Sequence, residues 1–454
     1  MWDFSTDPEF QKKLDWMKQF VRDEVEPMDL VFNRPGHNFD VTDKRALAAV
    51  RPLQAEVRRQ GLWACHLTPD LGGQGYGQVQ LALMNEILGA TKWGPRVFGC
   101  QAPDSGNAEI LAKFGTPEQR ARYLAPLLDG EIVSCFSMTE PQGGSDPRVF
   151  ETRAVRDGDE WVIDGYKWFS SQARWASFII VMAVTDPAAP AAERFSMFLV
   201  PAETPGVTIV RNTGLMGEHE DEGAHAYIHY DKVRVPADAM LGQEGGAFHV
   251  AQVRLGGGRI HHAMRTLGAA TKAYEMMKER AVSRFTQGGP LAGKQSTLAA
   301  IADSYVELLQ FRLLVLHAAW TIDQGDREAG KIGIGSVKIM SPRILKDIVG
   351  RAIQLHGSLG VSNELPLGGY WVKAASQGLV DGPTEVHQIG LAKRILKDAK
   401  PAAGLFPSEH IPTREAAARE KLARYIAMRE EDSHERAEAG DRHRQERLQR
   451  TGRG

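Results

Sequence analysis

Apolar residues recur at helical spacing from Pro8 to about Gly130, for example in the stretch FQKKLDWMKQFVRDEV. Residues three and four apart share one face of a helix, so this periodicity predicts amphipathic helices separated by Gly and Pro breaks. From about Glu131 to Gly242 the pattern changes to short runs rich in Val, Ile, Phe and Thr, with turn pairs such as Asp157-Gly158 between them. Such runs predict a β-domain.

Helical periodicity returns from Gln252 to about Lys400, in stretches long enough for a helical bundle. Beyond Pro401 the chain is dense in Arg and Glu, which predicts a solvated helix or a disordered segment. The expected fold class is therefore α+β multidomain. Its predicted parts are an N-terminal all-helical domain (1–130), a central β-domain (131–245), a C-terminal helical bundle (246–400) and a charged C-terminal tail (401–454).

Composition narrows the range of partners. The chain has 454 residues and a formal net charge of -2, a balance that favours neither a nucleic-acid partner nor an anionic membrane surface. No apolar segment is long enough to span a bilayer. Three widely spaced cysteines without a CxxC pair indicate a reducing compartment. We therefore expect the cytoplasm of a bacterium, or a mitochondrion or peroxisome if the source is eukaryotic.

Two segments of the β-domain have residues suited to a flat, polar ligand. The loop CFSMTEPQGGSD (135–146) follows an apolar strand and offers glycines, hydroxyls and backbone N–H groups that can surround a ring edge or a phosphate. An ordinary glycine loop is an equal alternative. The stretch GYKWFSS places Trp168 and Phe169 beside Ser170 and Ser171 on a strand. Aromatic faces beside hydroxyls suit a heterocycle, although core packing explains many single aromatics.

The C-terminal region contains a lone acid, Asp381, in an Asp-Gly-Pro turn after an apolar, strand-like run. A carboxylate placed against apolar surroundings is a candidate base, and a turn or helix-capping aspartate is the alternative. We expect no metal site. His225 and His229 are spaced like residues of one strand face, with Tyr227 between them.

Together these segments resemble the acyl-CoA dehydrogenase family, over about residues 5 to 398. The resemblance rests on MTEPQGGSD, GYKWFSS, the strand exit from Arg234 to Gly242, GGGRIHH, QLHGSLG and DGPTEVH. The motifs GRIHH and DGPTEVH are most similar to the subgroup of the tenth and eleventh human members. The resemblance implies an N-terminal helical domain, a central β-barrel or sandwich and a C-terminal four-helix bundle.

The resemblance also implies FAD as cofactor and a homo-oligomer, a dimer or dimer of dimers, in which the ADP half of FAD crosses a subunit boundary. Along the flavin it implies Phe136, Met138, Thr139, Gly144, Ser145, Phe169, Ser170 and Ser171. Toward the cofactor of a neighbouring chain it implies Arg284, Gln287, Gln295, Gln354, Gly357 and Ser358. Pro383 and Glu385 complete the implied cofactor site.

The implied reaction is the α,β-dehydrogenation of an acyl-CoA to the trans-2-enoyl-CoA, as in fatty acid β-oxidation, with an electron-transferring flavoprotein as acceptor. Asp381 would remove the α-proton, its backbone amide would bind the thioester carbonyl, and the flavin would accept the hydride. Substrate contacts are implied for Ser145, Gly258, Arg259 and Gly382. Most family members have glutamate in a Tyr-Glu-Gly-Thr turn, and aspartate is shorter by roughly 1.5 Å. The subgroup with DGP turns also has aspartate.

Two alternatives stay open. A flavin oxidase or monooxygenase of the same fold, similar to nitroalkane oxidase, also uses aspartate as base and differs in its rapid reaction with oxygen. A degenerate FAD-binding protein would keep the fold without the chemistry, because a fold alone does not establish activity. The GRIHH and DGPTEVH segments favour a dehydrogenase over the oxidase, and the acid retained in the expected turn speaks against the degenerate protein.

Overall fold

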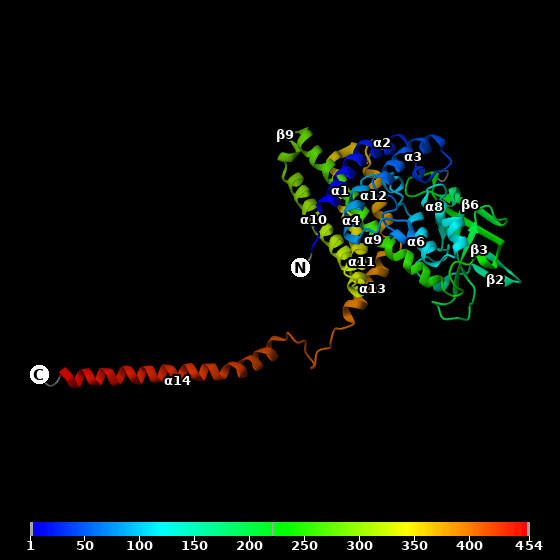
Figure 1. Cartoon of the computed structure of the whole chain (residues 1–454). Coiled ribbons are helices and arrows are strands. Elements are labelled where there is room, and N and C mark those ends of the chain that lie inside the picture. The colour runs from blue at the N-terminus through cyan, green and yellow to red at the C-terminus, as the bar shows by residue number, and fades with distance from the viewer. Residues whose placement is uncertain (1–2, 220–221, 452–454) are drawn as a thin grey trace. The chain divides into compact units, whose positions relative to one another are not determined.

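The computed structural model describes residues 3–219 and 222–451. The chain divides into two compact units, Met1–Lys393 and Arg394–Gly454. Unit 1 contains helices, then strands, then helices, as the periodicity predicts. In Figure 1 strands β2, β3 and β6 gather on one side, and helices α10 and α11, with strand β9, lie on the other.

The first part of unit 1 is helical. Its first helix begins where the carboxylate of Asp7 accepts the backbone N–H of Phe10 (2.9 Å), and Pro8 occupies the first turn, two features that favour a helix N-terminus. A π-helical turn, Val21–Val25, connects this helix to the second. The helices of this part are α1 (Pro8–Phe20), α2 (Glu26–Val31), α3 (Lys44–Arg59), α4 (Gln78–Leu88), α5 (Gly94–Val97), α6 (Asp104–Phe114), α7 (Pro117–Gln119) and α8 (Ala125–Leu128).

The middle part is a seven-stranded sheet of order β1-β4-β2-β3-β7-β6, with β5 paired to β4. All residues of β4 are buried, which is why this strand reads as a continuous apolar run rather than an alternating one. β3 and β7 pair antiparallel with a register shift between Lys167 and Ser170. The strands are β1 (Ser134–Ser137), β2 (Arg153–Asp157), β3 (Glu160–Ser171), β4 (Phe178–Val184), β5 (Phe195–Pro201), β6 (Val207–Thr213) and β7 (His225–Pro236).

The last part of unit 1 is built from long helices packed on one another, with one interruption that the periodicity does not predict. A short hairpin of β8 (Phe285–Thr286) and β9 (Gly289–Pro290) separates the first two helices. Gly288 and Gly289, with φ of +83° and +152°, make its tight turn, and glycine adopts such angles without steric cost. The helices are α9 (Ala247–Ser283), α10 (Gln295–Asp323), α11 (Arg327–His356), α12 (Leu367–Gln377) and α13 (Thr384–Leu396).

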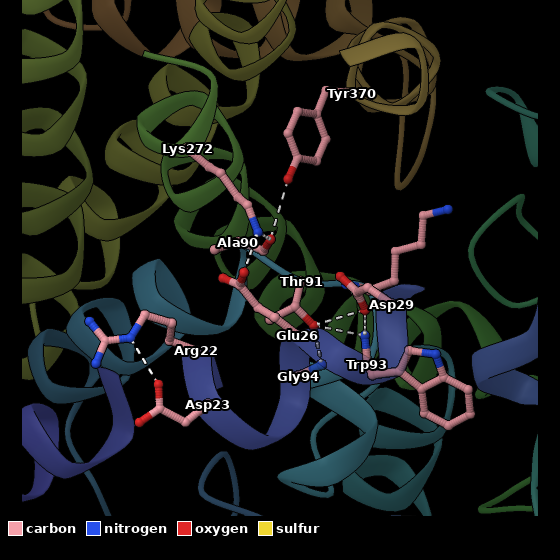
Figure 2. A network of polar contacts seen from close by, with 11 residues as sticks. Arg22, Asp23, Glu26, Asp29, Ala90, Thr91, Trp93, Gly94, Lys272 and Tyr370 are labelled. Atoms are coloured by element: carbon pink, nitrogen blue, oxygen red, sulfur yellow. Dashed lines mark hydrogen bonds and ion pairs between the residues drawn. The ribbon is translucent and has the colours of Figure 1, made fainter. Parts of the chain in front are cut away.

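The N-terminal and C-terminal helices share one apolar core, which includes Met17, Trp93, Met264 and Phe311. Polar contacts tie the same helices together at the end of α4 (Figure 2). Lys272 of α9 pairs with Glu26 of α2 (3.0 Å), and both Lys272 and Tyr370 of α12 donate to the carbonyl of Ala90 (3.3 Å each). Because the two helical regions share a core, the domain limits expected at 130, 245 and 400 stay predictions.

Unit 2 contains α14 (Ile411–Thr451), whose described residues are almost all exposed. Of the two forms expected for the charged tail, a solvated helix or a disordered segment, this structure has an exposed helix. Elsewhere, Cys65, Cys100 and Cys135 are free, buried thiols. Across the described residues, no helix is long and apolar enough to span a bilayer.

Candidate active site

The loop after β1 is anchored by a buried ion pair. Glu140 and Lys167 lie 2.8 Å apart with side chains at most 1 % exposed. The ammonium of Lys167 also donates to the carbonyl of Met138 (2.8 Å), and Glu140 accepts the backbone N–H of Glu151 and Thr152. Burial alone would raise the pKa of Glu140, but Lys167 and these N–H donors outweigh it and lower the pKa. Glu140 of the loop is thus tied to Lys167 of β3 and to the backbone of residues 151 and 152.

The glycine that this conformation requires is Gly143, next to the predicted Gly144. An added Cβ on Gly143 would lie 2.2 Å from Cγ2 of Val149, whereas one on Gly144 would meet Thr139 at 3.4 Å, an ordinary contact. Gly144 and Ser145 are exposed, so their backbone is open to a ligand. The role expected for the loop stays a prediction, and the sequence alone could not show that Gly143 has less space for a side chain than Gly144.

β3 presents an aromatic residue in a strained conformation next to this loop. Phe169 has a φ of +55° and is 41 % exposed, and it lies in the register shift between Lys167 and Ser170. A bulky residue rarely adopts positive φ, and bulges redirect side chains beside functional sites. Phe169 stacks on His225 (4.9 Å between ring centroids), whose pKa burial lowers to about 4.

Hydroxyl groups connect the two predicted flavin segments. Oγ of Ser137 and Oγ of Ser170 lie 2.8 Å apart, and the hydroxyl of Tyr230 donates to Ser137 (3.0 Å). The backbone N–H of Trp168 donates to the carbonyl of Thr139 (2.8 Å). The structure therefore brings the β1 loop and the end of β3 side by side, with the partly exposed Phe136, Met138, Thr139 and Phe169 along them.

Asp381 lies in the turn between α12 and α13. The sequence led us to expect a strand-like run before Asp381, and this expectation is wrong. Leu379 and Val380 donate their N–H groups to the carbonyl of Ser376 and continue the end of α12. Asp381 has a φ of +55° and Gly382 a φ of +104°. Aspartate tolerates the left-handed region better than most residues.

Basic groups surround this turn, so the expected apolar setting of Asp381 is wrong. Nε2 of His262 lies 3.5 Å from Oδ2 of Asp381, and Arg259 donates from Nε to the carbonyl of Asp381 (2.9 Å). Lys338 donates to the carbonyl of Val380 (2.7 Å). Burial lowers the pKa of His262 to about 4 and that of Lys338 to about 8, against the attraction of Asp381 in both cases.

Gly258 leaves the space that the carboxylate of Asp381 occupies. A Cβ built on Gly258 would lie 2.9 Å from Oδ2 of Asp381. A glycine in the interior of a helix costs about 0.5–1 kcal/mol relative to alanine. Its presence in α9 is explained by this close approach, and the side chain of Asp381 is only 13 % exposed.

Arg254 of α9 contacts the β1 loop and is influenced electrostatically by Asp381. Its guanidinium lies over the ring of Phe136 (4.0 Å to the centroid), it donates to Oδ1 of Asn107 (2.8 Å), and Asp381 raises its pKa against the larger, lowering effect of burial. The sequence did not single out Arg254, Lys338 or His262 as site residues. The adjacent histidines in GRIHH were the one available signal for His262.

The residues predicted to reach a neighbouring chain lie on the surface. Arg284 ends α9, Gln287 lies in the β8–β9 hairpin and Gln295 begins α10. Arg280, in the last turn of α9, donates to the carbonyl of His356 (3.5 Å), so the ends of α9 and α11 are adjacent. The exposed members of this set are Arg284, Gln287, Gln295, Gln354, Gly357 and Ser358. Of the other two residues implied for the cofactor site, Glu385 is exposed and Pro383 is half-buried.

No group of three or more His, Cys, Asp or Glu side chains within the described ranges is placed to hold a metal ion. His229 instead stacks on Tyr166 (4.2 Å between centroids), and it shares the partly exposed face of β7 with His225 and Tyr227.

Family models match nearly the whole of unit 1. The N-terminal domain of acyl-CoA dehydrogenases matches residues 7–131, the middle domain 135–233 and the C-terminal domain 245–396. The probable acyl-CoA dehydrogenase FadE2 of Mycobacterium tuberculosis is 44 % identical over 363 residues, 79 % of this chain and 88 % of that protein.

Two animal relatives are longer than this chain. Acyl-CoA dehydrogenase family member 10 of mouse is 37 % identical over 86 % of this chain, which spans 37 % of that protein. Family member 11 of human is 39 % identical over 76 % of this chain, which spans 45 % of that protein. The expected similarity to these two members is confirmed.

Solved structures have the same fold. A candidate acyl-CoA dehydrogenase from Mycobacterium abscessus is 37 % identical with a TM-score of 0.80, over 87 % of this chain and 99 % of that one. A glutaryl-CoA dehydrogenase from Mycobacterium smegmatis in complex with FADH2 is 25 % identical with a TM-score of 0.72, over 87 % and 97 %. The expected helical, β and helical domains are confirmed, and the chain belongs to the acyl-CoA dehydrogenase family of flavin-dependent oxidoreductases.

Proposed function

We propose that this chain binds FAD and oxidises the α,β bond of an acyl-CoA to the trans-2-enoyl-CoA, with Asp381 as the base that removes the α-proton. The geometry of the Asp381 turn carries the proposal. Its carboxylate lies against a glycine of α9, and its carbonyl is bound by Arg259. Among the described residues no acceptor takes the N–H of Asp381, which leaves this donor for a thioester carbonyl.

The residues around the β1 loop fit a flavin. An exposed aromatic ring at positive φ and an anchored loop with an open backbone at Gly144 and Ser145 suit a flat, polar heterocycle. We infer that Phe136, Met138, Thr139, Gly144, Ser145, Phe169, Ser170 and Ser171 contact the FAD of their own chain. When bound, FAD supplies the acceptor for the hydride that leaves the β-carbon.

This chain's own residues handle the proton and the carbonyl. Asp381 accepts the α-proton on its carboxylate, and its N–H stabilises the negative charge that develops on the thioester oxygen. Gly382, with φ of +104°, permits the turn, and Gly258 keeps α9 clear of the carboxylate. Ser145 and Arg259 are the further substrate contacts of the proposal, since a guanidinium fork suits phosphate and carbonyl oxygens.

We further propose a homo-oligomer, a dimer or dimer of dimers, in which the exposed set from Arg284 to Ser358 reaches the ADP half of a neighbour's FAD, with Pro383 and Glu385 beside it. Exposed glutamines and an arginine at the joined ends of α9 and α11 supply donors for phosphate oxygens. The acceptor of electrons would be an electron-transferring flavoprotein, and the role would be fatty acid β-oxidation. Free, buried thiols favour a reducing compartment such as the cytoplasm.

The test is anaerobic titration of the purified protein with acyl-CoAs of graded length and branching, followed by visible absorption and by analysis of the product. We expect one of them to bleach the flavin band and to yield its enoyl-CoA. We then expect air to reoxidise the bleached protein slowly. A protein without flavin, or one that no thioester bleaches, would contradict the proposal, and rapid reoxidation by air would favour an oxidase.

A further inference from the structure

A buried lysine of α11 donates hydrogen bonds to the backbone just before Asp381. The side chain of Lys338 is fully buried, and its Nζ donates to the carbonyls of Gln377 and Val380, each at 2.7 Å. A buried ammonium is costly unless its bonds recover the lost hydration. The bond to Gln377 is explained by the end of α12, since cations cap the last carbonyls of helices. Val380 lies beyond that end.

The carbonyl of Val380 and the N–H of Asp381 belong to the same peptide group. In a planar trans peptide the two point in opposite directions, so an ammonium on the oxygen aims the N–H away from Lys338. A charge-assisted bond to the carbonyl also polarises the group and makes its N–H a stronger donor, because bonds in a chain reinforce one another.

Three observations show that the turn is arranged around this peptide. The N–H groups of Leu379 and Val380 are bound by Ser376 and that of Thr384 by Gly378, so that only Asp381 and Gly382 keep N–H groups without an acceptor in the described part of this turn. Within the described part of the chain, the N–H of Asp381 has no acceptor.

The next carbonyl along, that of Asp381, is held by Arg259 at 2.9 Å and contacts Nε2 of His387 at 3.3 Å. Two consecutive carbonyls are therefore fixed by basic side chains, and the one N–H between them is left open.

We propose that Lys338 is a positioning residue, which acts through the Val380–Asp381 peptide to orient and polarise the N–H that binds the thioester carbonyl. The proposal rests on the proposed function, because it assumes that this N–H faces the substrate. Its alternative is that Lys338 only caps α12.

The size of the effect follows from two general magnitudes. Loss of a whole donor to a developing oxyanion lowers kcat by about 10² to 10³, and cooperative polarisation amounts to roughly 10–30 % of a bond. On the logarithmic scale, this fraction corresponds to a fall in kcat of about two- to eight-fold when the charge is removed.

The test compares the holoenzyme with its Lys338→Met and Lys338→Gln variants. Methionine keeps the volume without a donor, and glutamine keeps a neutral donor. The direct readout is the infrared carbonyl stretch of the enoyl-CoA product, labelled with ¹³C at the thioester carbon and bound to the oxidised enzyme. Its shift to lower frequency on binding measures the strength of the bond from Asp381 N–H. Steady-state kcat and KM, flavin content and Tm are measured on the same samples.

We expect the carbonyl shift to decrease from wild type to Lys338→Gln to Lys338→Met, with kcat falling in the same order and KM changing little. Lys272→Met is the control, because Lys272 is also a lysine bonded to a backbone carbonyl, that of Ala90, but its side chain is 27 % exposed and lies in the network of Figure 2 rather than at the Asp381 turn. That variant should keep the wild-type carbonyl band whatever its Tm.

An unmoved carbonyl band in both Lys338 variants, or a fall in kcat that only follows Tm, would assign Lys338 to the helix cap and overturn the proposal. If Lys338→Met fails to fold, the glutamine variant still decides, since it can keep both bonds without the charge. A wild-type protein that no acyl-CoA reduces would overturn the proposed function itself. An active wild type, together with Lys338 variants whose bound product has the wild-type carbonyl band, would overturn the role of Lys338 alone.

Discussion

Replacing Gly258 by alanine should lower activity without lowering stability. The added Cβ would lie 2.9 Å from Oδ2 of Asp381, about 0.5 Å inside an ordinary contact between carbon and oxygen. The carboxylate is the end of a rotatable side chain, so it should give way rather than α9. A misplacement of about 1 Å can cost 10²-fold in rate. We therefore expect kcat to fall roughly ten-fold.

Stability should move in the opposite direction. Alanine in a helix interior is favoured over glycine by about 0.5–1 kcal/mol, and α9 runs unbroken from Ala247 to Ser283. We expect the Tm of Gly258→Ala to equal or exceed that of the wild type. If kcat falls while Tm does not, the loss of activity results from displacement of the base and not from a general loss of structure.

Gly256→Ala is the matched control. It lies two residues away on the same helix, and a Cβ there would meet no atom within 4 Å. It should gain the same helix stability and keep the wild-type rate. Measuring kcat and Tm on all three proteins decides the matter. The reasoning is refuted if Gly258→Ala reacts as fast as the wild type, or if Gly256→Ala loses as much activity.

Two further predictions concern stability. Burial lowers the pKa of four histidines to about 4, below the unfolded value near 6.5, so the unfolded chain binds more protons between these values. The contribution of these neutral histidines to the free energy of unfolding is therefore complete above pH 6.5 and is lost as the pH falls toward 4. Urea unfolding should show this loss, with a smaller pH slope in His66→Gln, and an equal slope would count against the buried neutral state. The four are His66, His225, His262 and His387.

In the second prediction, Lys167→Met leaves Glu140 buried without its cation, and the free energy of unfolding should fall by about 3–5 kcal/mol. The double variant Glu140→Gln/Lys167→Met should cost less in the same assay, and additive costs would contradict the coupling.

The sequence predicted those features that depend on local chemistry. The continuous apolar run of β4 and the amphipathic face of α1 produced the right elements because burial imposes those patterns. The Asp-Gly-Pro turn was visible because few residues suit left-handed angles. The β8–β9 hairpin was missed although Gly288 and Gly289 gave a signal, since the helical stretches on both sides dominated the interpretation.

The surroundings of Asp381 could not be predicted in the same way. Lys338 and Arg254 look like ordinary helical cations in the sequence, and only tertiary packing brings them to the turn. The apolar residues before Asp381 indicated a dry setting, but neighbouring helices supply basic groups instead. Such contacts join residues 42 positions apart for Lys338 and 122 positions apart for Arg259, which no local pattern encodes.

The central claim is that Asp381 is the base, and the most direct measurement is flavin reduction by rapid mixing of acyl-CoA with the wild type and Asp381→Asn. Asparagine matches aspartate in size and tolerates the φ of +55°, so the turn should persist and FAD should stay bound. Loss of a general base lowers rates by about 10² to 10⁴. We predict a fall of that size with flavin content unchanged. Reduction by Asp381→Asn at the wild-type rate would contradict the account.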